Sequence, residues 1–384
     1  MKRILIITNV PNPYRIALFN ELDAQLRKEG MELLVIFGAE GYVRRLSKTD
    51  MSEAKFPFKI LSGGVFTSAE NTERTFFGYK GLMKEVKAYH PWRTIVIGFS
   101  PATVRLFFHS FFRDFRYIIW AGSILREGRN DSFLRVTQRK MLMKRAAAFI
   151  AYGSLARDYF VHYGVPVHKT AIAINTSDPS FFIRQTDEIR SKEGDHYKDS
   201  LHHLLYIGYL VRRKNVGKLI EVVQALALTR QDFVLDIVGD GESRLELENK
   251  VSELNLTQYV KFHGFRQKSE LPAFLAKSSV FLFQTDFDVW GLTLNEAMAA
   301  ALPVLSSINA GATFDLIQEG VNGYAVDYND TLKVTGLLHQ LLNNPVQCKK
   351  MGEEGRKILL AKASLETSAA GFLKAIRISE GTTG

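Results

Sequence analysis

Short apolar runs alternate with longer amphipathic stretches along most of the chain. The apolar runs contain few polar residues, which is typical of parallel strands covered on both faces. The longer stretches have the spacing of helices. The pattern predicts an α/β protein with doubly wound sheets. The expected strands are residues 3–8, 32–37, 94–98, 117–120 and 148–151, then 204–207, 233–238, 260–262, 280–283 and 303–305; the expected helices include 16–30, 216–229, 244–254 and 292–301.

The most polar interval, residues 184–203, lies between the two series of strands and shows no apolar period. We interpret it as a linker. The predicted domains are therefore residues 1–183 and 204–363, and a last helix at about 364–384 could pack back on the first domain. Ligands of doubly wound sheets bind at the carboxyl ends of the strands. We expect the two domains to face a central cleft that holds the ligand.

Composition agrees with a globular protein of two domains: 384 residues, of which 46% are hydrophobic and 23% are charged. The single cysteine, Cys348, excludes an internal disulfide and a cysteine zinc cluster, and it favours a reducing compartment. The apolar run at residues 4–7 is too short for a signal peptide, and no run approaches the ~20 residues that span a bilayer. We predict a cytoplasmic protein.

The positive charge is uneven. The formal net charge is +10, and residues 101–150 hold ten Lys and Arg against three Asp and Glu, a net +7. Residues 126–145 interleave basic and apolar side chains, as helices on anionic membranes do. Phenylalanines at 107, 108, 111, 112 and 115 recur at helical spacing, and either the core or a membrane could receive them. We predict a peripheral contact with an anionic membrane surface, and no nucleic acid, because no recognised binding module is present.

The candidate chemistry is concentrated in residues 286–301. An apolar strand ends in a polar loop, and Gly291 then begins a helix. A helix N-terminus suits a diphosphate, and glycine permits close approach. Asp288 before the helix and Glu296 inside it could accept hydrogen bonds from hydroxyl groups of a sugar and a ribose. Spacing alone leaves open that both carboxylates are only solvated surface groups.

This stretch resembles the signature of the retaining glycosyltransferases of family 4, the bacterial group 1 type, which have the GT-B fold of two Rossmann-like domains. In that family two glutamates with seven residues between them precede Ala-Met-Ala and a Leu-Pro-Val strand. Here Asp288 and Glu296 have that spacing, followed by Ala-Met-Ala and Leu-Pro-Val. Further similar segments keep the family's order, at residues 207–216, 238–241, 260–265 and 320–323, with 13–19, 151–154 and 175–178 in the first half.

The resemblance implies a role for each matching residue. Glu296 would bind the ribose, Asp288 the donor sugar and Lys214 the diphosphate. The donor side would also include Arg213, Phe265, Gly239 and the backbone at Gly291, Leu292 and Thr293; the acceptor side would include Tyr14 and Arg15. No metal or other cofactor is implied beside a UDP- or GDP-sugar donor.

Two positions depart from the family pattern. Asp288 is one methylene shorter than the usual glutamate, and Tyr209 stands where the family usually has an arginine. Either Arg212 or Arg213 could supply the missing cation. The lone histidines, His109 and His263, are interpreted as structural.

The predicted function is transfer of a sugar, with retention, to a saccharide or lipid-linked acceptor in cell-surface polysaccharide or glycolipid synthesis. A nucleotide-sugar epimerase is one alternative, and a non-catalytic scaffold subunit, favoured by Tyr209, is another. A dehydrogenase is disfavoured because residues 10–13 contain no glycine of a dinucleotide fingerprint.

Overall fold

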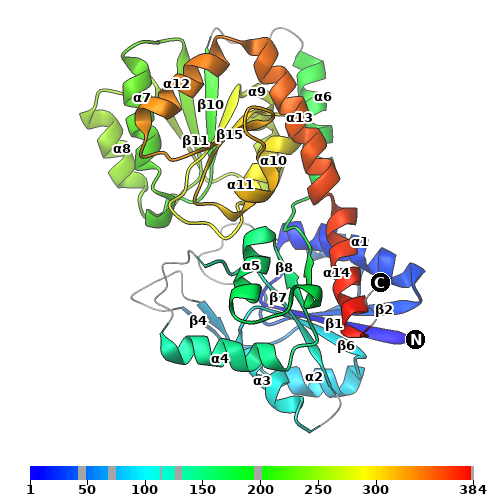
Figure 1. The fold of residues 1–384 in the computed structure, drawn as a ribbon. Coiled ribbons are helices and arrows are strands. Elements are labelled where there is room, and N and C mark those ends of the chain that lie inside the picture. Colours follow the sequence, from blue (N-terminus) through cyan, green and yellow to red (C-terminus); the bar gives the residue numbers. More distant parts are fainter. Residues whose placement is uncertain (42–48, 68–74, 113–114, 126–131, 194–200, 382–384) are drawn as a thin grey trace. The chain divides into compact units, whose positions relative to one another are not determined.

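The structure, a computed structural model, describes residues 1–384 except 42–48, 68–74, 113–114, 126–131, 194–200 and 382–384. The chain forms two compact units, Met1–Ser177 with Leu365–Gly384, and Asp178–Ser364. Each unit contains a parallel sheet with helices on both sides (Figure 1). The predicted α/β class is confirmed.

The first unit is built on seven parallel strands in the order β3-β2-β1-β6-β7-β8-β9. The strands are β1 (Lys2–Thr8), β2 (Met31–Phe37), β3 (Phe58–Ile60), β6 (Arg93–Ile97), β7 (Tyr117–Ala121), β8 (Ala148–Ala151) and β9 (Thr170–Ile172), and β4 (Val65–Thr67) pairs with β5 (Thr75–Phe77) as a separate antiparallel ribbon. The helices are α1 (Pro13–Lys28), α2 (Leu82–Tyr89), α3 (Pro101–His109), α4 (Phe133–Lys144), α5 (Ser154–His162) and α14 (Leu365–Ser379).

Helix α14, the last in the chain, packs on α1, β8 and β9 within the first unit. Gly371 allows this close approach, because a Cβ there would lie 2.4 Å from the carbonyl oxygen of Ile172. The ring of Phe372 lies 4.9 Å from that of Trp120, and both side chains are buried. Helix α14 thus completes the core of the unit that β1 and α1 begin.

The second unit is built on six parallel strands in the order β12-β11-β10-β13-β14-β15. The strands are β10 (His202–Ile207), β11 (Phe233–Val238), β12 (Val260–Gly264), β13 (Val280–Phe283), β14 (Val304–Ser307) and β15 (Gly323–Val326). The helices are α6 (Pro179–Glu193), α7 (Gly217–Ala227), α8 (Arg244–Glu253), α9 (Leu271–Lys277), α10 (Leu292–Ala299), α11 (Gly311–Leu316), α12 (Thr331–Leu342) and α13 (Pro345–Ala363).

Residues 184–193, which the sequence places in a linker, are helical and belong to α6 of the second unit. Polar side chains of this segment bond to the rest of the unit: Arg190 donates to the carbonyl oxygens of Ala300 at 2.7 Å and Ala276 at 3.0 Å, and Asp187 accepts from Arg356 at 2.8 Å. Phe182 at the start of the helix is fully buried. A helix held by a few long polar side chains shows little apolar periodicity, which is why the pattern suggested a linker. Of the rest of that interval, residues 194–200 lie outside the described part of the chain.

Candidate functional site

The strand order of the second unit reverses between β10 and β13, the place where doubly wound sheets bind ligands. The loop after β10 contains a 3-10 turn, Arg212–Lys214, and the loop after β13 leads to α10. Hydrogen bonds join the two loops, because Asp286 N and Thr285 Oγ1 donate to Arg213 O at 2.9 and 3.2 Å. Two segments about seventy residues apart in sequence therefore form one surface at the carboxyl ends of neighbouring strands.

Lys214 and Asp288 form the central ion pair of this surface, with Nζ donating to Oδ2 at 2.5 Å. Lys214 is only 6% exposed, and a buried ammonium is costly without an acidic partner. Burial alone would raise the pKa of Asp288, but Lys214 and then Arg213 outweigh it and hold that pKa below its usual value. Asp288 therefore stays ionised and keeps Lys214 at the switch point.

Arg213 is the arginine of this turn that faces the ion pair. Its Nη1 donates to Phe287 O at 3.1 Å and lies 3.9 Å from Asp288 Oδ2, whereas Arg212 is exposed. Tyr209, at the position where the family has an arginine, is 40% exposed. The structure thus brings Arg213, rather than Arg212, to the place where a second cation is expected.

Helix α10 begins at Gly291, whose backbone has a φ of 109°. A Cβ at this position would lie 2.2 Å from the Phe283 ring, so glycine is required by packing as well as by conformation. Leu292 and Thr293 form the first turn, where backbone N–H groups have no acceptor within the helix. The turn is anchored by Trp290, which is buried and donates from Nε1 to Asn295 Oδ1 at 3.2 Å.

Glu296 lies one helical turn beyond Leu292 and is held differently from Asp288. Its side chain keeps partial exposure, but Oε2 is shielded and has no hydrogen-bond partner among the described residues. Burial raises the pKa of Glu296 to about 8, opposed weakly by Lys268. A shielded carboxyl oxygen without a partner, on the helix that begins at the switch point, is ready to bond a ligand hydroxyl.

The glycines after β10 and β11 allow two loops to touch. A Cβ on Gly239, where φ is 150°, would lie 1.8 Å from Gly208 O, so no larger residue fits there. Phe265 directly follows β12 and is half-buried. Gly239 and Phe265 therefore lie at the same end of the sheet as Lys214, at the carboxyl ends of β11 and β12.

A buried charge network that the sequence did not suggest lies under α9. Asp236, fully buried on β11, pairs with His203 Nδ1 at 2.5 Å, with His263 Nε2 at 2.6 Å and with Lys277 Nζ at 3.7 Å. Burial would raise the pKa of Asp236, but these partners together lower it far below its usual value. The sequence feature that could have revealed the network is Asp236 itself, an aspartate in the middle of an otherwise apolar strand. His263, interpreted as structural, indeed serves this network.

In the first unit the strand order reverses between β1 and β6, and Tyr14 and Arg15 lie on the first turn of α1 beside this point. Arg15 is buried, donates to Tyr152 Oη at 3.0 Å and to Thr8 Oγ1, and lies 4.8 Å from the Trp120 ring centre. No carboxylate among the described residues pairs with it. The guanidinium is thus held by neutral hydroxyls and an aromatic face.

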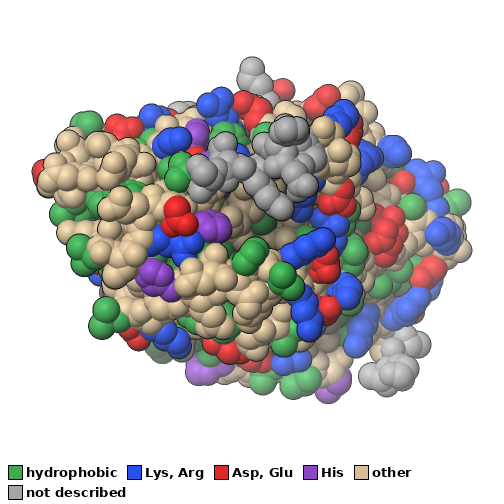
Figure 2. All heavy atoms as spheres, turned by 90° about the horizontal axis from the view of Figure 1, so that it is seen from above, with side chains coloured by type: hydrophobic (Ala, Val, Ile, Leu, Met, Phe, Trp, Pro, Cys, Tyr) green, Lys and Arg blue, Asp and Glu red, His purple; other side chains and the backbone are tan. Residues whose placement is uncertain are grey.

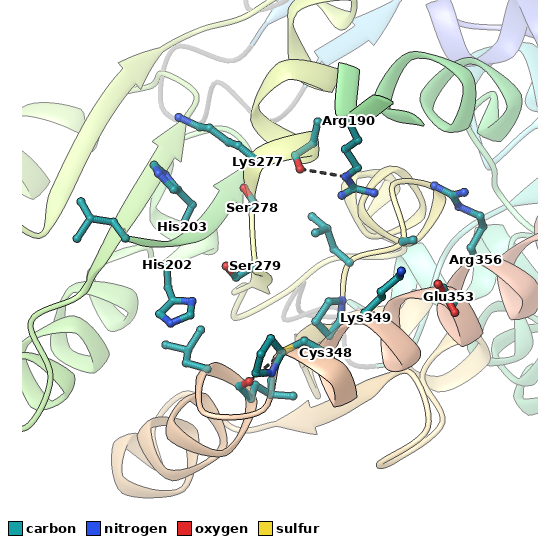
Figure 3. A pocket seen from close by; sticks show the side chains of 18 of the residues that line it. Arg190, His202, His203, Lys277, Ser278, Ser279, Cys348, Lys349, Glu353 and Arg356 are labelled. Carbon is teal, nitrogen blue, oxygen red and sulfur yellow. Dashed lines mark hydrogen bonds between the residues drawn. The ribbon is translucent and has the colours of Figure 1, made fainter. Parts of the chain in front are cut away.

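A pocket of about 700 Å³ in the second unit lies at the other end of the sheet (Figure 3). It is lined by residues that begin or precede strands, among them His202, Ser279 and Pro303. Its arginines are already bonded, since Arg356 pairs with Asp187 at 2.8 Å and Arg190 binds carbonyl groups. None of the predicted site residues lines this pocket.

The described residues contain no group of three or more His, Cys, Asp and Glu placed to hold a metal ion. Within the same residues, no helix is both long and apolar enough to cross a bilayer.

Two parallel doubly wound sheets with this site geometry define the GT-B fold, and the similar solved structures have it. The chain is similar over 98% of its length to HepE of Anabaena in complex with UDP, covering 99% of that chain with 18% identity and a TM-score of 0.76. It matches sucrose-phosphate synthase of Thermosynechococcus elongatus over all of both chains, with 16% identity and a TM-score of 0.74. The predicted GT-B fold is confirmed.

Residues 187–358, most of the second unit, match the family model of "Glycosyl transferases group 1". The chain is 25% identical over 258 residues to alpha-D-kanosaminyltransferase of Streptomyces kanamyceticus, covering 67% of this chain and 66% of that protein. It is 30% identical over 179 residues to N-acetyl-alpha-D-glucosaminyl L-malate synthase of Bacillus anthracis, covering 46% and 45%. The chain thus spans between about half and two thirds of the length of these curated relatives.

Proposed function

We propose that this protein is a retaining glycosyltransferase of the family 4 type, which transfers a sugar from a nucleoside diphosphate to a saccharide or lipid-linked acceptor in polysaccharide or glycolipid synthesis. The observation that carries the proposal is the cluster at the switch point of the second sheet: Lys214 held by Asp288, a helix beginning at Gly291, and the shielded carboxyl group of Glu296. The family model covers all of it, and HepE was solved with UDP and with UDP-glucose.

The donor diphosphate would bind where positive charge converges. Lys214, Arg213 and the free N–H groups of the first turn of α10 all meet at the loop after β13. When the diphosphate arrives, Lys214 exchanges the Asp288 carboxylate for a phosphate oxygen. Asp288 is then able to accept a hydrogen bond from a hydroxyl group of the donor sugar.

Glu296 would bind the ribose. A carboxyl group with a pKa of about 8 is largely protonated at neutral pH. Two ribose hydroxyls that donate to its oxygens would favour the ionised form and lower that pKa. Nucleotide binding should therefore release a proton from Glu296 near neutral pH, and the hydroxyls replace the hydrogen bonds that Oε2 lacks.

In the transfer step the acceptor hydroxyl oxygen bonds to the anomeric carbon on the face from which the diphosphate leaves. The bond between that carbon and the phosphate oxygen breaks, and the leaving phosphate takes the hydroxyl proton. Lys214, Arg213 and the N-terminus of α10 stabilise the charge that develops on the phosphate. Because these groups supply positive charge at the leaving phosphate, we propose that no metal ion takes part. Tyr14 and Arg15 are proposed to bind the acceptor.

The experiment is a binding screen by thermal shift and calorimetry with UDP, GDP, ADP and CMP and their sugar conjugates, with EDTA present. We expect one nucleoside diphosphate to stabilise the protein, and Glu296→Ala to lose that effect. Glu253→Ala, which removes an exposed carboxylate at the end of α8, is the matched control. The anomeric configuration of the product, read by NMR, then tests retention.

Other outcomes support other functions. Absence of binding by any nucleotide would favour the scaffold alternative. Conversion of the donor sugar to its epimer without an acceptor would favour an epimerase. Loss of activity on metal removal would contradict the metal-independent mechanism.

A further inference from the structure

The end of α3 exposes aromatic rings on the surface of the first unit. Phe107 is buried, but Phe108, Phe111 and Phe112 are exposed, and Phe112 is 85% accessible. The run of phenylalanines is therefore divided between the core and the exposed surface. Burial of a phenylalanine ring is favourable, so three exposed neighbours call for an explanation.

Helix α4 exposes a face of the same kind. Phe133 and Leu134 are 83% and 79% accessible, and Met141, two turns further along, is exposed as well. Lys140 and Lys144 lie on the same side of the helix, while Leu142 and Met143 face the core. The outer face of α4 thus interleaves large apolar side chains with ammonium groups, and it carries no acidic residue.

The two helices form one surface. Figure 1 shows α3 and α4 side by side at one edge of the first unit, and the two helices are in contact. Arg145, which follows α4, donates from Nε to Ser110 Oγ at 3.1 Å, and its guanidinium lies 4.4 Å from the centre of the Phe111 ring. We call this the α3–α4 surface; it consists of Phe108, Phe111, Phe112, Phe133, Leu134, Lys140, Met141, Lys144 and Arg145.

Its charge is of one sign. The charged residues of this surface, Lys140, Lys144 and Arg145, are all basic, and the described residues of the interval 101–150 include no Asp or Glu. The three acidic residues of the interval lie outside the described part. On the face drawn in Figure 2, by contrast, Lys and Arg lie beside Asp and Glu, and hydrophobic side chains are scattered.

We propose that the α3–α4 surface docks this protein on an anionic lipid bilayer. The rings and Leu134 enter the boundary between headgroups and acyl chains, and the lysines reach the anionic headgroups along their aliphatic stems. A protein partner fits less well, because protein interfaces are depleted in lysine. The inference goes beyond the proposed transfer reaction and does not depend on it, since it rests on residues of the first unit alone.

The test is flotation of the purified 384-residue protein with vesicles of phosphatidylcholine, alone or mixed with phosphatidylglycerol. We expect binding only to the mixed vesicles, and its loss at high salt. Lys140→Gln with Lys144→Gln should lower the partition coefficient about thirtyfold, because each basic residue at such a surface contributes about 1 kcal/mol. Phe133→Ser with Leu134→Ser should lower it at least about tenfold.

The matched controls change equally exposed residues of the second unit: Leu332→Ser with Val346→Ser, and Lys333→Gln with Lys350→Gln. They should bind vesicles as the unchanged protein does, and all variants should keep its circular dichroism spectrum and melting temperature. Three results would overturn the proposal: no binding to the mixed vesicles, equal binding to neutral ones, or equal loss in the controls. Binding of single-stranded RNA through the same residues without vesicle binding would assign the surface to nucleic acid instead.

Discussion

The switch points of the two sheets each hold a buried cation, but they hold it in opposite ways. Lys214 in the second unit is paired with a carboxylate at 2.5 Å. Arg15 in the first unit lies against two neutral hydroxyls and the rings of Tyr14 and Trp120. An ion pair can exchange its acid for the phosphate of a ligand, whereas hydroxyl and ring contacts hold a guanidinium in one place. The comparison indicates an exchangeable cation in the second unit and a fixed one in the first.

The largest expected effect tests the exchangeable cation. Lys214→Met should lower the rate of glycosyl transfer about 100-fold or more, because it removes the charge that stabilises the leaving phosphate. It should also remove the thermal shift caused by the nucleotide. Lys218→Met, on the nearby helix α7, is the control and should retain both. Donor turnover at the unchanged rate in the Lys214 variant would remove Lys214 from the site.

The second effect concerns a buried charge that no ligand should exchange. Asp236→Asn should lower the free energy of unfolding by about 3 kcal/mol at neutral pH, because it leaves His203, His263 and Lys277 without their acid. Urea unfolding measures this.

The pH dependence of that difference has a definite sign. The folded-state pKa of Asp236 is lowered, so its contribution is complete above the unfolded-state pKa of about 3.9 and is lost as the pH falls below it. The difference in unfolding free energy between the unchanged protein and Asp236→Asn should therefore narrow below about pH 4. A difference that stays constant below about pH 4 would contradict an ionised Asp236 in the folded protein.

The third effect tests the fixed cation. Arg15→Met removes the buried guanidinium and the two hydrogen bonds that it donates. We expect the free energy of unfolding to fall by about 2 kcal/mol. The stabilisation by the nucleotide should be unchanged, the reverse of the result for Lys214→Met. Arg157→Met, a partly exposed arginine on α5, is the control for removal of a charge in the same unit. A lost nucleotide response in the Arg15 variant would end the distinction between the two cations.

The smallest effect distinguishes the two carboxyl groups of the second unit, Glu296 and Asp288, by the direction in which their pKa values are shifted. The pKa of Glu296 is raised, so the folded state loses stability as the pH rises from about 4.3, the unfolded-state value, to about 8. Glu296→Gln removes this loss and should raise the melting temperature by a few degrees at pH above about 8, while it weakens nucleotide binding. Asp288→Asn should lower the melting temperature, because it removes the carboxylate that pairs with the buried Lys214. If Glu296→Gln and Asp288→Asn changed the melting temperature equally, this would contradict a raised pKa for Glu296 and a lowered pKa for Asp288.

Much of the site could be predicted because its signals are local. Gly291 directly before an apolar helix, Asp288 in the preceding loop and Glu296 one turn into the helix are features of a single stretch of chain. Short elements were missed: β3, β9 and β15 have three or four residues each, too few for a period to show. Helix α6 was missed because part of its packing is polar: Arg190 donates to the carbonyl groups of Ala276 and Ala300, and Asp187 accepts from Arg356.

The sequence by itself determined the alternation of apolar strands and amphipathic helices and the place where the candidate helix begins. Only the tertiary structure decided that Arg213 rather than Arg212 faces Asp288, that Asp236 meets His203 and His263, and that Phe107 is buried while Phe112 is exposed. The physical reason is the order of the strands. Periodicity reports which face of an element is apolar, but the neighbours of that face depend on strand order and loop path, which bring residues far apart in sequence within hydrogen-bond distance.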